Sequence, residues 1–374
     1  MRVYVYPADK GGCGYYRLIW PAMMLRTMGH DVRIVSPDVV ERVTGSTDGN
    51  GRLVSISAPT DADVMVFQRV SSRRMLEAIP IWRAHGIAVV MDIDDDMSAI
   101  NQSNPAWTAL HPRGEKKNEE YDWNTARKIC AASTYVTVST DALMNRYVNV
   151  GQGGNVLRNA IPRAAFAIKN QPEQGVVGWP ASLHSHPDDP QVVGTSMMKL
   201  QREGYEFKVI GSPHGIREAF KLDREPLSTG MTSVGMWPHE IAKLRVGIAP
   251  LNDTRFNEAK SWLKMLECAA VGVPVVGSPR REYRALHALG VGLLANTPSE
   301  WYRHVKRLLD DDSFRDEVVQ RGRAAVEQLV LEDNAWRWWE AWTRALELER
   351  GPLNIRKRPT ATTREPATDA TGRT

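Results

Sequence analysis

The sequence of 374 residues has little cysteine and no long apolar run. Its three cysteines, Cys13, Cys130 and Cys268, are an odd number without short spacing. This excludes a disulfide framework and a cysteine-based metal cluster, and it fits a reducing cytoplasm. Apolar runs such as residues 87–91 fall far below the roughly 18 residues of a membrane span. Residues 1–6 alternate as in a strand and lack the apolar core of a signal peptide. We therefore expect a cytoplasmic protein without a transmembrane segment.

A strong excess of one charge is also missing. Lys and Arg number 48 against 44 Asp and Glu, so the net charge is only +4, and this balance does not indicate nucleic acid as a partner. Short Arg-rich stretches, residues 72–74 and 280–281, could still bind phosphates locally. With 42% apolar and 25% charged residues, the composition is that of a soluble globular protein. The length suggests two domains of about 150 residues each.

The sequence does contain a repeated alternation of short β-branched runs with helical stretches, which is typical of parallel α/β architecture. In the first half, strands are expected at residues 2–6, 31–36, 64–69, 88–92 and 135–139. In the second half, they are expected at residues 176–179, 207–210, 231–234, 246–250 and 273–278. The polar, glycine-rich segment 151–170 indicates a boundary between the halves, and the chain is expected to be helical from Pro298 on.

This order predicts two Rossmann-like parallel-sheet domains, residues 1–165 and 166–325, that face each other across a cleft. Residues 326–350 are expected to form a helix that packs back on the body, and residues 351–374 a disordered tail. Ligands of such sheets bind beyond the carboxyl ends of the strands. The strand-to-helix loops are therefore the place to look for function.

The first of these loops, residues 11–17, is rich in glycine. Gly12 and Gly14 match the opening of the dinucleotide fingerprint G-x-G-x-x-G, but Arg17 stands where the third glycine belongs. No acidic residue ends the strand at 31–36, so NAD is not expected. We expect instead that a phosphate or a sugar approaches the backbone at a helix start, with the Arg17 guanidinium nearby. A plain tight turn is the alternative.

Four carboxylates lie at and just after the end of the strand at 88–92, namely Asp92, Asp94, Asp95 and Asp96. They repel one another unless Mg²⁺ or Mn²⁺, nearby arginines or the hydroxyls of a sugar compensate their charges. Capping and solvation of an ordinary loop is the alternative without a function. If the cluster is functional, we expect Asp94 to bind sugar hydroxyls rather than a metal.

A third loop, residues 178–189, offers hydroxyl and imidazole groups after the first strand of the second half. Ser182 can give hydroxyl and backbone donors to a phosphate. His184 and His186 can stabilise charge or bind a metal, but no third ligand lies close in the sequence. Ser182 and His184 are therefore the candidate ligand contacts of this loop.

The most informative segment is residues 246–276, in which a strand leads through a loop into a helix expected to begin near Lys260 and Ser261. Amide groups at the start of this helix, together with Lys260, make a pocket for a doubly charged diphosphate. Glu267 lies two turns further on roughly the same face and can accept from both hydroxyls of a ribose. A solvated charged face is the alternative. However, two apolar strands flank the helix, and a buried glutamate needs a partner.

The run P-L-x-D-T-x-F-N-x-x-K-S-x-L-K-x-L-E-x-A-A-x-G-x-P-V-V in this segment resembles the donor-binding signature of one branch of glycosyltransferase family four, which consists of retaining GT-B enzymes. Residues 14–17, 92–96 with 104–105, and 178–184 resemble other recurring segments of that branch. The resemblance extends in order over residues 1 to about 345. Similar sequences are frequent in bacteria and in actinobacterial phages, so a phage-encoded member in the host cytoplasm is one expectation.

The resemblance implies transfer of a sugar from a nucleotide diphosphate to an acceptor hydroxyl of a protein, glycan or lipid, with retention at the anomeric carbon. A leaving phosphate oxygen helps to deprotonate the acceptor, so no protein nucleophile, metal or other cofactor is implied. The first domain is expected to bind the acceptor and the second the donor. Glu267 corresponds to the second glutamate of the family's E-x7-E motif. The first falls at Ala259, which has no carboxylate, and Glu258 is one residue out of register.

Lys260 is therefore expected to take over the diphosphate charge, helped by Arg17, and Asp94 completes the expected catalytic set. The expected donor-binding residues are Gly12, Gly14, Ser182, His184, Lys260, Ser261, Trp262, Leu263 and Glu267. Two other functions stay open. The missing glutamate at Ala259 suggests a sugar-nucleotide-binding module that no longer catalyses, and the Arg-rich stretches suggest a phage enzyme that glucosylates DNA.

Overall fold

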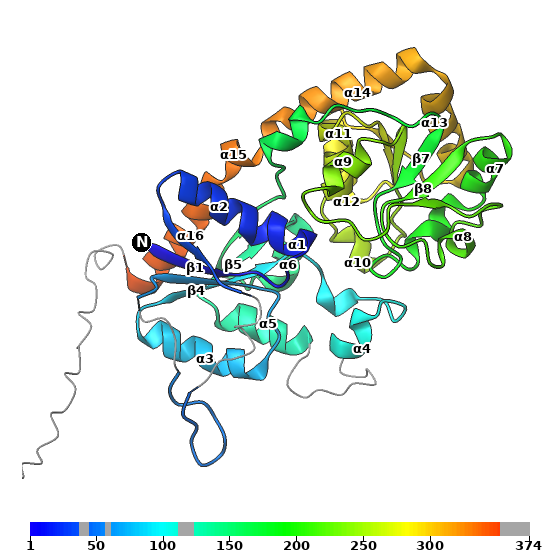
Figure 1. The fold of residues 1–374 in the computed structure, drawn as a ribbon. Coiled ribbons are helices and arrows are strands. Elements are labelled where there is room, and N and C mark those ends of the chain that lie inside the picture. Colours follow the sequence, from blue (N-terminus) through cyan, green and yellow to red (C-terminus); the bar gives the residue numbers. More distant parts are fainter. Residues whose placement is uncertain (37–44, 57–60, 111–122, 352–374) are drawn as a thin grey trace, which may run out of the picture.

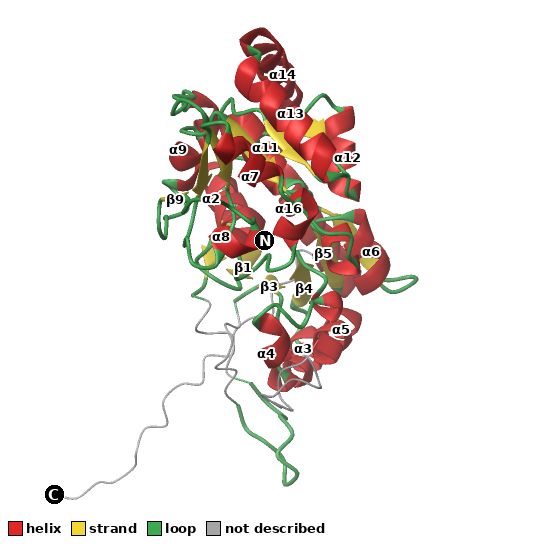
Figure 2. Cartoon of the chain, turned by 90° about the vertical axis from the view of Figure 1, so that its right-hand side faces the viewer, coloured by secondary structure: helices red, strands yellow, loops and turns green. Residues whose placement is uncertain are grey.

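The structure, a computed structural model, describes residues 1–36, 45–56, 61–110 and 123–351, so the expected tail lies outside the described residues from position 352 on. The chain forms two lobes, each built on a six-stranded sheet (Figures 1 and 2). Strand order is β2-β1-β3-β4-β5-β6 in the first sheet and β12-β11-β10-β7-β8-β9 in the second. All neighbouring strands of the two sheets run parallel. The two predicted parallel sheets are therefore present.

The first sheet comes from residues 2–156. Its strands are β1 (Arg2–Tyr6), β2 (Asp31–Ile34), β3 (Val64–Gln68), β4 (Ala88–Ile93), β5 (Tyr135–Val138) and β6 (Gly153–Val156). Its helical segments are α1 (Gly12–Gly14), the π-helical turn η1 (Tyr15–Ile19), α2 (Trp20–Thr27), α3 (Arg73–Ala84), the 3-10 turn η3 (Met97–Ala99), α4 (Ala106–Leu110), α5 (Trp123–Ala132) and α6 (Asp141–Tyr147). Alternate residues of a strand enter opposite cores. Val64 and Val66 of β3 share a core with α2, whereas Met65 and Phe67 share one with α3 and α5. Covering both faces explains why this strand is apolar along most of its length.

The second sheet comes from residues 176–294. Its strands are β7 (Val176–Trp179), β8 (Glu206–Val209), β9 (Leu227–Ser228), β10 (Val246–Ala249), β11 (Val275–Gly277) and β12 (Leu293–Leu294). Its helices are α7 (Ser196–Arg202), α8 (Ile216–Ala219), α9 (Trp237–Ile241), α10 (Arg255–Glu258), α11 (Leu263–Ala270), α12 (Arg281–Ala288), α13 (Pro298–Asp310) and α14 (Asp312–Val326). Glycine at position 247 lets α11 lie close to β10, because a Cβ there would come within 2.9 Å of the Cys268 Sγ.

Three details of the predicted strands are wrong. Residues 231–234 form no strand, because the chain leaves the sheet after β9 and turns at Gly230, where φ is 66°. The segment 151–170 is not only a boundary, since it contains β6 at the edge of the first sheet. Its glycines permit this pairing, because a Cβ on Gly153 would lie 2.5 Å from the Tyr135 ring. Finally, the two residues of β12 are too few to show a strand pattern.

After α14 the chain returns to the first lobe through α15 (Leu331–Asn334) and α16 (Trp336–Arg350) (Figure 1). Trp338 and Trp342 of α16 are 1% and 0% exposed and share a core with β1 and α2. The Trp338 indole Nε1 also donates to the Arg17 carbonyl at 2.9 Å. These tryptophans therefore anchor α16 on the first sheet. In the described part of the chain, no helix has the length and apolar character to cross a membrane.

Candidate active site

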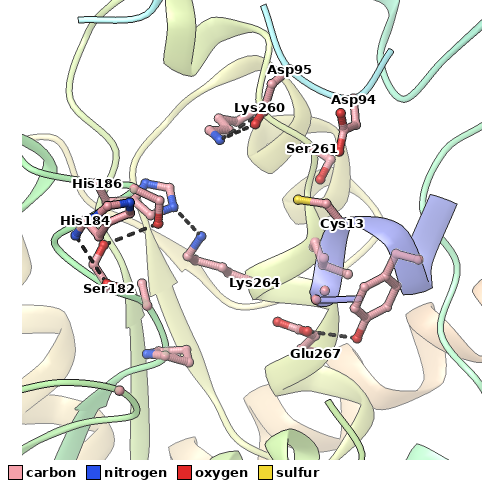
Figure 3. A pocket seen from close by; sticks show the side chains of 18 of the residues that line it. Cys13, Asp94, Asp95, Ser182, His184, His186, Lys260, Ser261, Lys264 and Glu267 are labelled. Atoms are coloured by element: carbon pink, nitrogen blue, oxygen red, sulfur yellow. Dashed lines mark hydrogen bonds and ion pairs between the residues drawn. The ribbon is translucent and has the colours of Figure 1, made fainter. Parts of the chain in front are cut away.

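Loops at the carboxyl ends of both sheets line one cavity of about 590 Å³. The first half contributes the loops after β1, β3 and β4, which carry Gly12, Arg69 and Asp94. The second half contributes the loop after β7, with Ser182, His184 and His186, and the segment from Phe256 to Glu267 around the start of α11 (Figure 3). The cavity thus lies where the parallel topology of the two sheets predicts a ligand site.

The start of α11 faces this cavity. Lys260, Ser261, Leu263 and Lys264 all line it. Trp262 does not; it is 6% exposed and its Nε1 donates to the Asn159 carbonyl at 2.9 Å. The Trp262 side chain therefore does not make the predicted contact with a ligand. Instead it anchors the helix start on the linker from the first half.

Lys260 reaches across the cavity to the first half. Its Nζ lies 2.9 and 3.1 Å from the two carboxylate oxygens of Asp95 (Figure 3) and 4.4 Å from the centre of the Phe256 ring. Burial disfavours the charge of Lys260, but the Asp95 carboxylate outweighs burial and raises the pKa of Lys260. Lys260 is thus a charged, preorganised group whose charge Asp95 already balances.

The other carboxylates of the aspartate cluster are balanced in the same way. The ion pairs are Asp92–Arg17 (2.9 Å), Asp94–Arg69 (3.1 Å), Asp95–Lys260 (2.9 Å) and, for Asp96, Arg146 (2.6 Å) and Arg255 (3.4 Å). Among the described residues, no group of three His, Cys, Asp or Glu side chains is placed to hold a metal ion. Only Asp94 and Asp95 of the cluster line the cavity. Burial raises the pKa of Asp94 despite its Arg69 partner.

Arg17 borders the cavity, but its guanidinium is turned into the protein. Nε and one terminal nitrogen donate to both Asp92 oxygens at 3.0 and 2.9 Å. The other terminal nitrogen donates to the Asn159 Oδ1 at 2.9 Å and to the Leu157 carbonyl. With every nitrogen engaged in a site of 0% exposure, Arg17 has a structural role, and its expected contact with a diphosphate is not supported.

The glycines of the first loop have different roles. The Gly11 and Gly14 amides donate to the Asp9 Oδ1 at 2.9 and 3.0 Å, so a carboxylate of the chain already caps this helix start. A Cβ on Gly14 would lie 2.0 Å from the Asp9 carbonyl oxygen, which makes Gly14 a requirement of the turn and not a ligand contact. Gly12 faces open space and lines the cavity.

In the loop after β7, Ser182 and His184 line the cavity, but the more closely bonded side chain is His186. His186 Nδ1 lies 2.6 Å from the Asp189 Oδ2, and its Nε2 lies 2.9 Å from the Lys264 Nζ (Figure 3). Burial, and then the Lys264 charge, lower the pKa of His186 to about 4. His186 is not among the ligand contacts predicted from the sequence, because its partner Lys264 is 78 residues away and local spacing does not reveal it.

Glu267 is buried in the wall of the cavity with an exposure of 4%. It accepts a hydrogen bond from the Tyr16 hydroxyl of the first half at 2.8 Å, and burial raises its pKa. This is the partner that a buried glutamate requires. At the position of the missing glutamate, Ala259 is fully buried, and its carbonyl accepts from the Thr140 Oγ1 at 3.1 Å.

Comparison with known proteins gives a match to one domain and a likeness in fold. Residues 196–338, which include α11, match a family model described as glycosyl transferase-like. No curated protein matches the sequence.

Solved structures of similar fold cover most of the chain. HepE of Anabaena in complex with UDP and glucose has a TM-score of 0.61 at 11% identity and covers 92% of this chain and 99% of its own. Sucrose-phosphate synthase from Thermosynechococcus elongatus has a TM-score of 0.61 at 12% identity, with 92% and 99% covered. A glycosyltransferase from Rickettsia africae has a TM-score of 0.63 at 10% identity, with 92% and 98% covered.

These likenesses confirm the predicted fold class, two parallel-sheet halves of the GT-B type. The matched domain, residues 196–338, is similar to glycosyl transferases, the predicted class of enzyme.

Proposed function

Starting from a glycosyl transferase-like domain within a GT-B fold, we propose that this chain moves a sugar from a nucleotide-diphosphate donor to the hydroxyl of an acceptor. One observation carries the proposal: the start of α11, two lysines and a buried carboxylate line the same cavity between the halves. A helix start with cations suits a diphosphate, and a carboxylate about 6 Å further along the helix suits the hydroxyls of a ribose. A nucleoside diphosphate needs both within one pocket.

The donor then lies on the second half, residues 166–325, with its diphosphate at Lys260, Ser261 and Leu263 and its ribose at Glu267. Ser182 and His184 line the same side of the cavity, and Gly12 faces it from the first half. The acceptor, a protein, glycan or lipid hydroxyl, enters from the first half, residues 1–165. Its side of the cavity presents the following residues beyond the aspartates: Met97, Ile100, Asn104 and Ala106.

The proposed chemistry retains the configuration of the sugar. The bond between the anomeric carbon and the phosphate oxygen breaks, the acceptor oxygen bonds to the same face of that carbon, and the acceptor proton passes to the leaving phosphate oxygen. Lys260 stabilises the charge that develops on the diphosphate, while Asp94 holds sugar hydroxyls. Contact between the halves excludes water, which would otherwise compete as acceptor. The proposal includes no metal or other cofactor, and a cytoplasmic site of action, in the host if the chain is phage-encoded.

The test is release of free sugar from a panel of UDP- and GDP-sugars by the purified protein, with and without EDTA. UDP-glucose comes first, because the HepE structure holds UDP and glucose. Hydrolysis of one donor that persists in EDTA supports the proposal, and the anomer first formed on an added acceptor reports retention by NMR. Loss of activity in EDTA would contradict the metal-free mechanism.

A second function is favoured by Ala259, which places a buried methyl group where a catalytic carboxylate is expected. In that case the chain binds a sugar nucleotide without turning it over. Tight binding of a donor that is neither hydrolysed nor transferred would favour this binding module over the enzyme.

A further inference from the structure

The cations that line the cavity are not equivalent. Arg17, Arg69 and Lys260 each pair with a carboxylate of the aspartate cluster. Lys264, on the first turn of α11, forms no ion pair with any described residue, and its hydrogen-bond partner is the His186 imidazole at 2.9 Å. Burial lowers the pKa of Lys264, and the neighbouring Lys260 charge lowers it further, so an incoming anion would favour its charged form.

His186 is itself held by a fixed acceptor. His186 Nδ1 donates to the Asp189 Oδ2 at 2.6 Å. The Asp189 Oδ1 accepts from the Asn252 amide at 2.8 Å and from the Asn257 Nδ2 at 2.6 Å. A carboxylate accepts only, so His186 carries its proton on Nδ1 and turns the lone pair of Nε2 to Lys264. Asp189, His186 and Asn257 are buried, with 3%, 6% and 4% exposed.

This chain of bonds holds an ammonium group in place without cancelling its charge. A carboxylate, as at Lys260, would orient the group but would also neutralise it, whereas a neutral imidazole orients it and leaves the field of the cation for a ligand. We propose that Lys264 binds the diphosphate of the donor and that His186 and Asp189 are positioning residues, which hold its Nζ toward the cavity. The inference rests on the proposed function and names the group that performs its binding step.

The experiment is calorimetric titration of the purified full chain with UDP and with GDP. Lys264→Met should weaken binding by about 10- to 100-fold, the size of a lost charge-assisted hydrogen bond. His186→Phe, which keeps a ring but has no acceptor, should weaken it by a similar or smaller factor. His186→Gln keeps an acceptor oxygen and should restore most of the affinity. Lys199→Met removes an exposed lysine of α7 outside the cavity and should bind as the wild type does.

Asp189→Asn separates positioning from simple packing. Its amide oxygen can keep the bonds to Asn252 and Asn257, but its NH2 group then faces His186 Nδ1. The proton moves to Nε2 and points at the Lys264 ammonium, so nucleotide binding should weaken although the shape is unchanged. In steady-state hydrolysis of a donor, these positioning variants should raise KM more than they lower kcat, because the contact is already made before the reaction.

The outcomes distinguish the two proposals. Wild-type protein that binds neither nucleotide and hydrolyses no donor would overturn the proposed function. Wild-type binding matched by Lys264→Met would overturn the role of Lys264 alone. Weak binding by Lys264→Met with normal binding by both His186→Phe and Asp189→Asn would overturn the positioning roles. Thermal unfolding of each variant identifies a folding defect, and in that event His186→Gln against Asp189→Asn decides the positioning roles.

Discussion

The two walls of the cavity use charge in different ways. At the end of β4 and in the loop that follows it, each of the four carboxylates from Asp92 to Asp96 is paired with a cation of the chain. On α11, Lys264 and Glu267 hydrogen-bond to neutral groups, an imidazole and a phenol. The paired charges at 92–96 stabilise the fold and the contact between the halves. The charges of Lys264 and Glu267 are not neutralised by their hydrogen-bond partners and can therefore interact with a ligand. Lys260, paired with Asp95 yet at the helix start, belongs to both walls.

The largest expected effect breaks a pair in the first wall. Arg17→Met leaves the carboxylate of Asp92, which is 0% exposed, without its counter-charge. Removing one partner of a buried ion pair costs about 3–5 kcal/mol, and the free energy of unfolding from urea denaturation should fall by this amount. Arg202→Met is the matched control, because its partner Asp223 lies in an exposed pair, and it should change stability by less than about 1 kcal/mol. Equal stabilities of the two variants would contradict the structural role of Arg17.

The next effect concerns the residue shared by both walls. Lys260→Ala should lower kcat by about 10²–10³-fold, the range for loss of one preorganised donor to developing charge. Donor hydrolysis under single-turnover and steady-state conditions measures it. Lys243→Ala, which removes a lysine paired with Glu240 outside the cavity, should leave kcat unchanged. If kcat also stays unchanged in Lys260→Ala, Lys260 has no part in the reaction.

His186, the hydrogen-bond partner of Lys264, should make the stability of the protein depend on pH. An unfolded chain takes up a proton on His186 near pH 6.5, but the folded chain does so only near pH 4, because burial and Lys264 lower the pKa. The stability present above pH 6.5 is therefore lost as the pH falls toward 4, by about 3 kcal/mol from this group. His186→Gln has no such group, so its free energy of unfolding should fall less steeply over this range. Parallel curves for both proteins would show that His186 titrates normally in the folded state.

A smaller effect is expected at the ribose end of the second wall. Glu267→Gln loses an acceptor in a buried site and should weaken UDP binding by about 1–3 kcal/mol. Glu258→Gln is the control, because it lies on the same segment but outside the cavity lining, and its Kd should equal that of the wild type. Calorimetric titration with UDP measures the Kd of both variants. The same Kd in both variants would remove Glu267 from the donor site.

The location of the site could be predicted from the sequence for a reason that lies in the fold. The buried strands appear as short apolar, β-branched runs that can be recognised without knowing their partners, and parallel strands bring their carboxyl ends to one edge. Lys260 and Ser261 lie directly before α11 and Glu267 lies within it, so local spacing places them together. The strands that were missed, β6, β9 and β12, are edge strands whose pairing depends on contacts and not on pattern.

How the charges are partnered could not be predicted, because partners come from distant parts of the chain. Arg17 and Asp92 are 75 residues apart, and His186 and Lys264 are 78 apart. From sequence, a guanidinium in a glycine-rich loop resembles a phosphate ligand, and a histidine without a nearby third ligand resembles an ordinary loop residue. Only the three-dimensional contacts separate the neutralised Arg17 from the available Lys264.

The smallest expected effect comes from giving Lys260 a neutral partner like that of Lys264. Asp95→Asn removes the carboxylate that balances Lys260 and leaves an oriented cation beside a neutral amide, the situation that Lys264 already has with His186. The pair is 16% and 17% exposed, so its strength is near that of surface pairs, about 1 kcal/mol. UDP should then bind about fivefold more tightly in calorimetry. Asp253→Asn, which removes the exposed carboxylate that pairs with Arg280 outside the cavity, should not change Kd. Weaker binding by Asp95→Asn would instead mean that the carboxylate contacts the nucleotide or orients Lys260 for it. In that case the balanced pair would itself be part of the donor site, and the division between the two walls would fail at this residue.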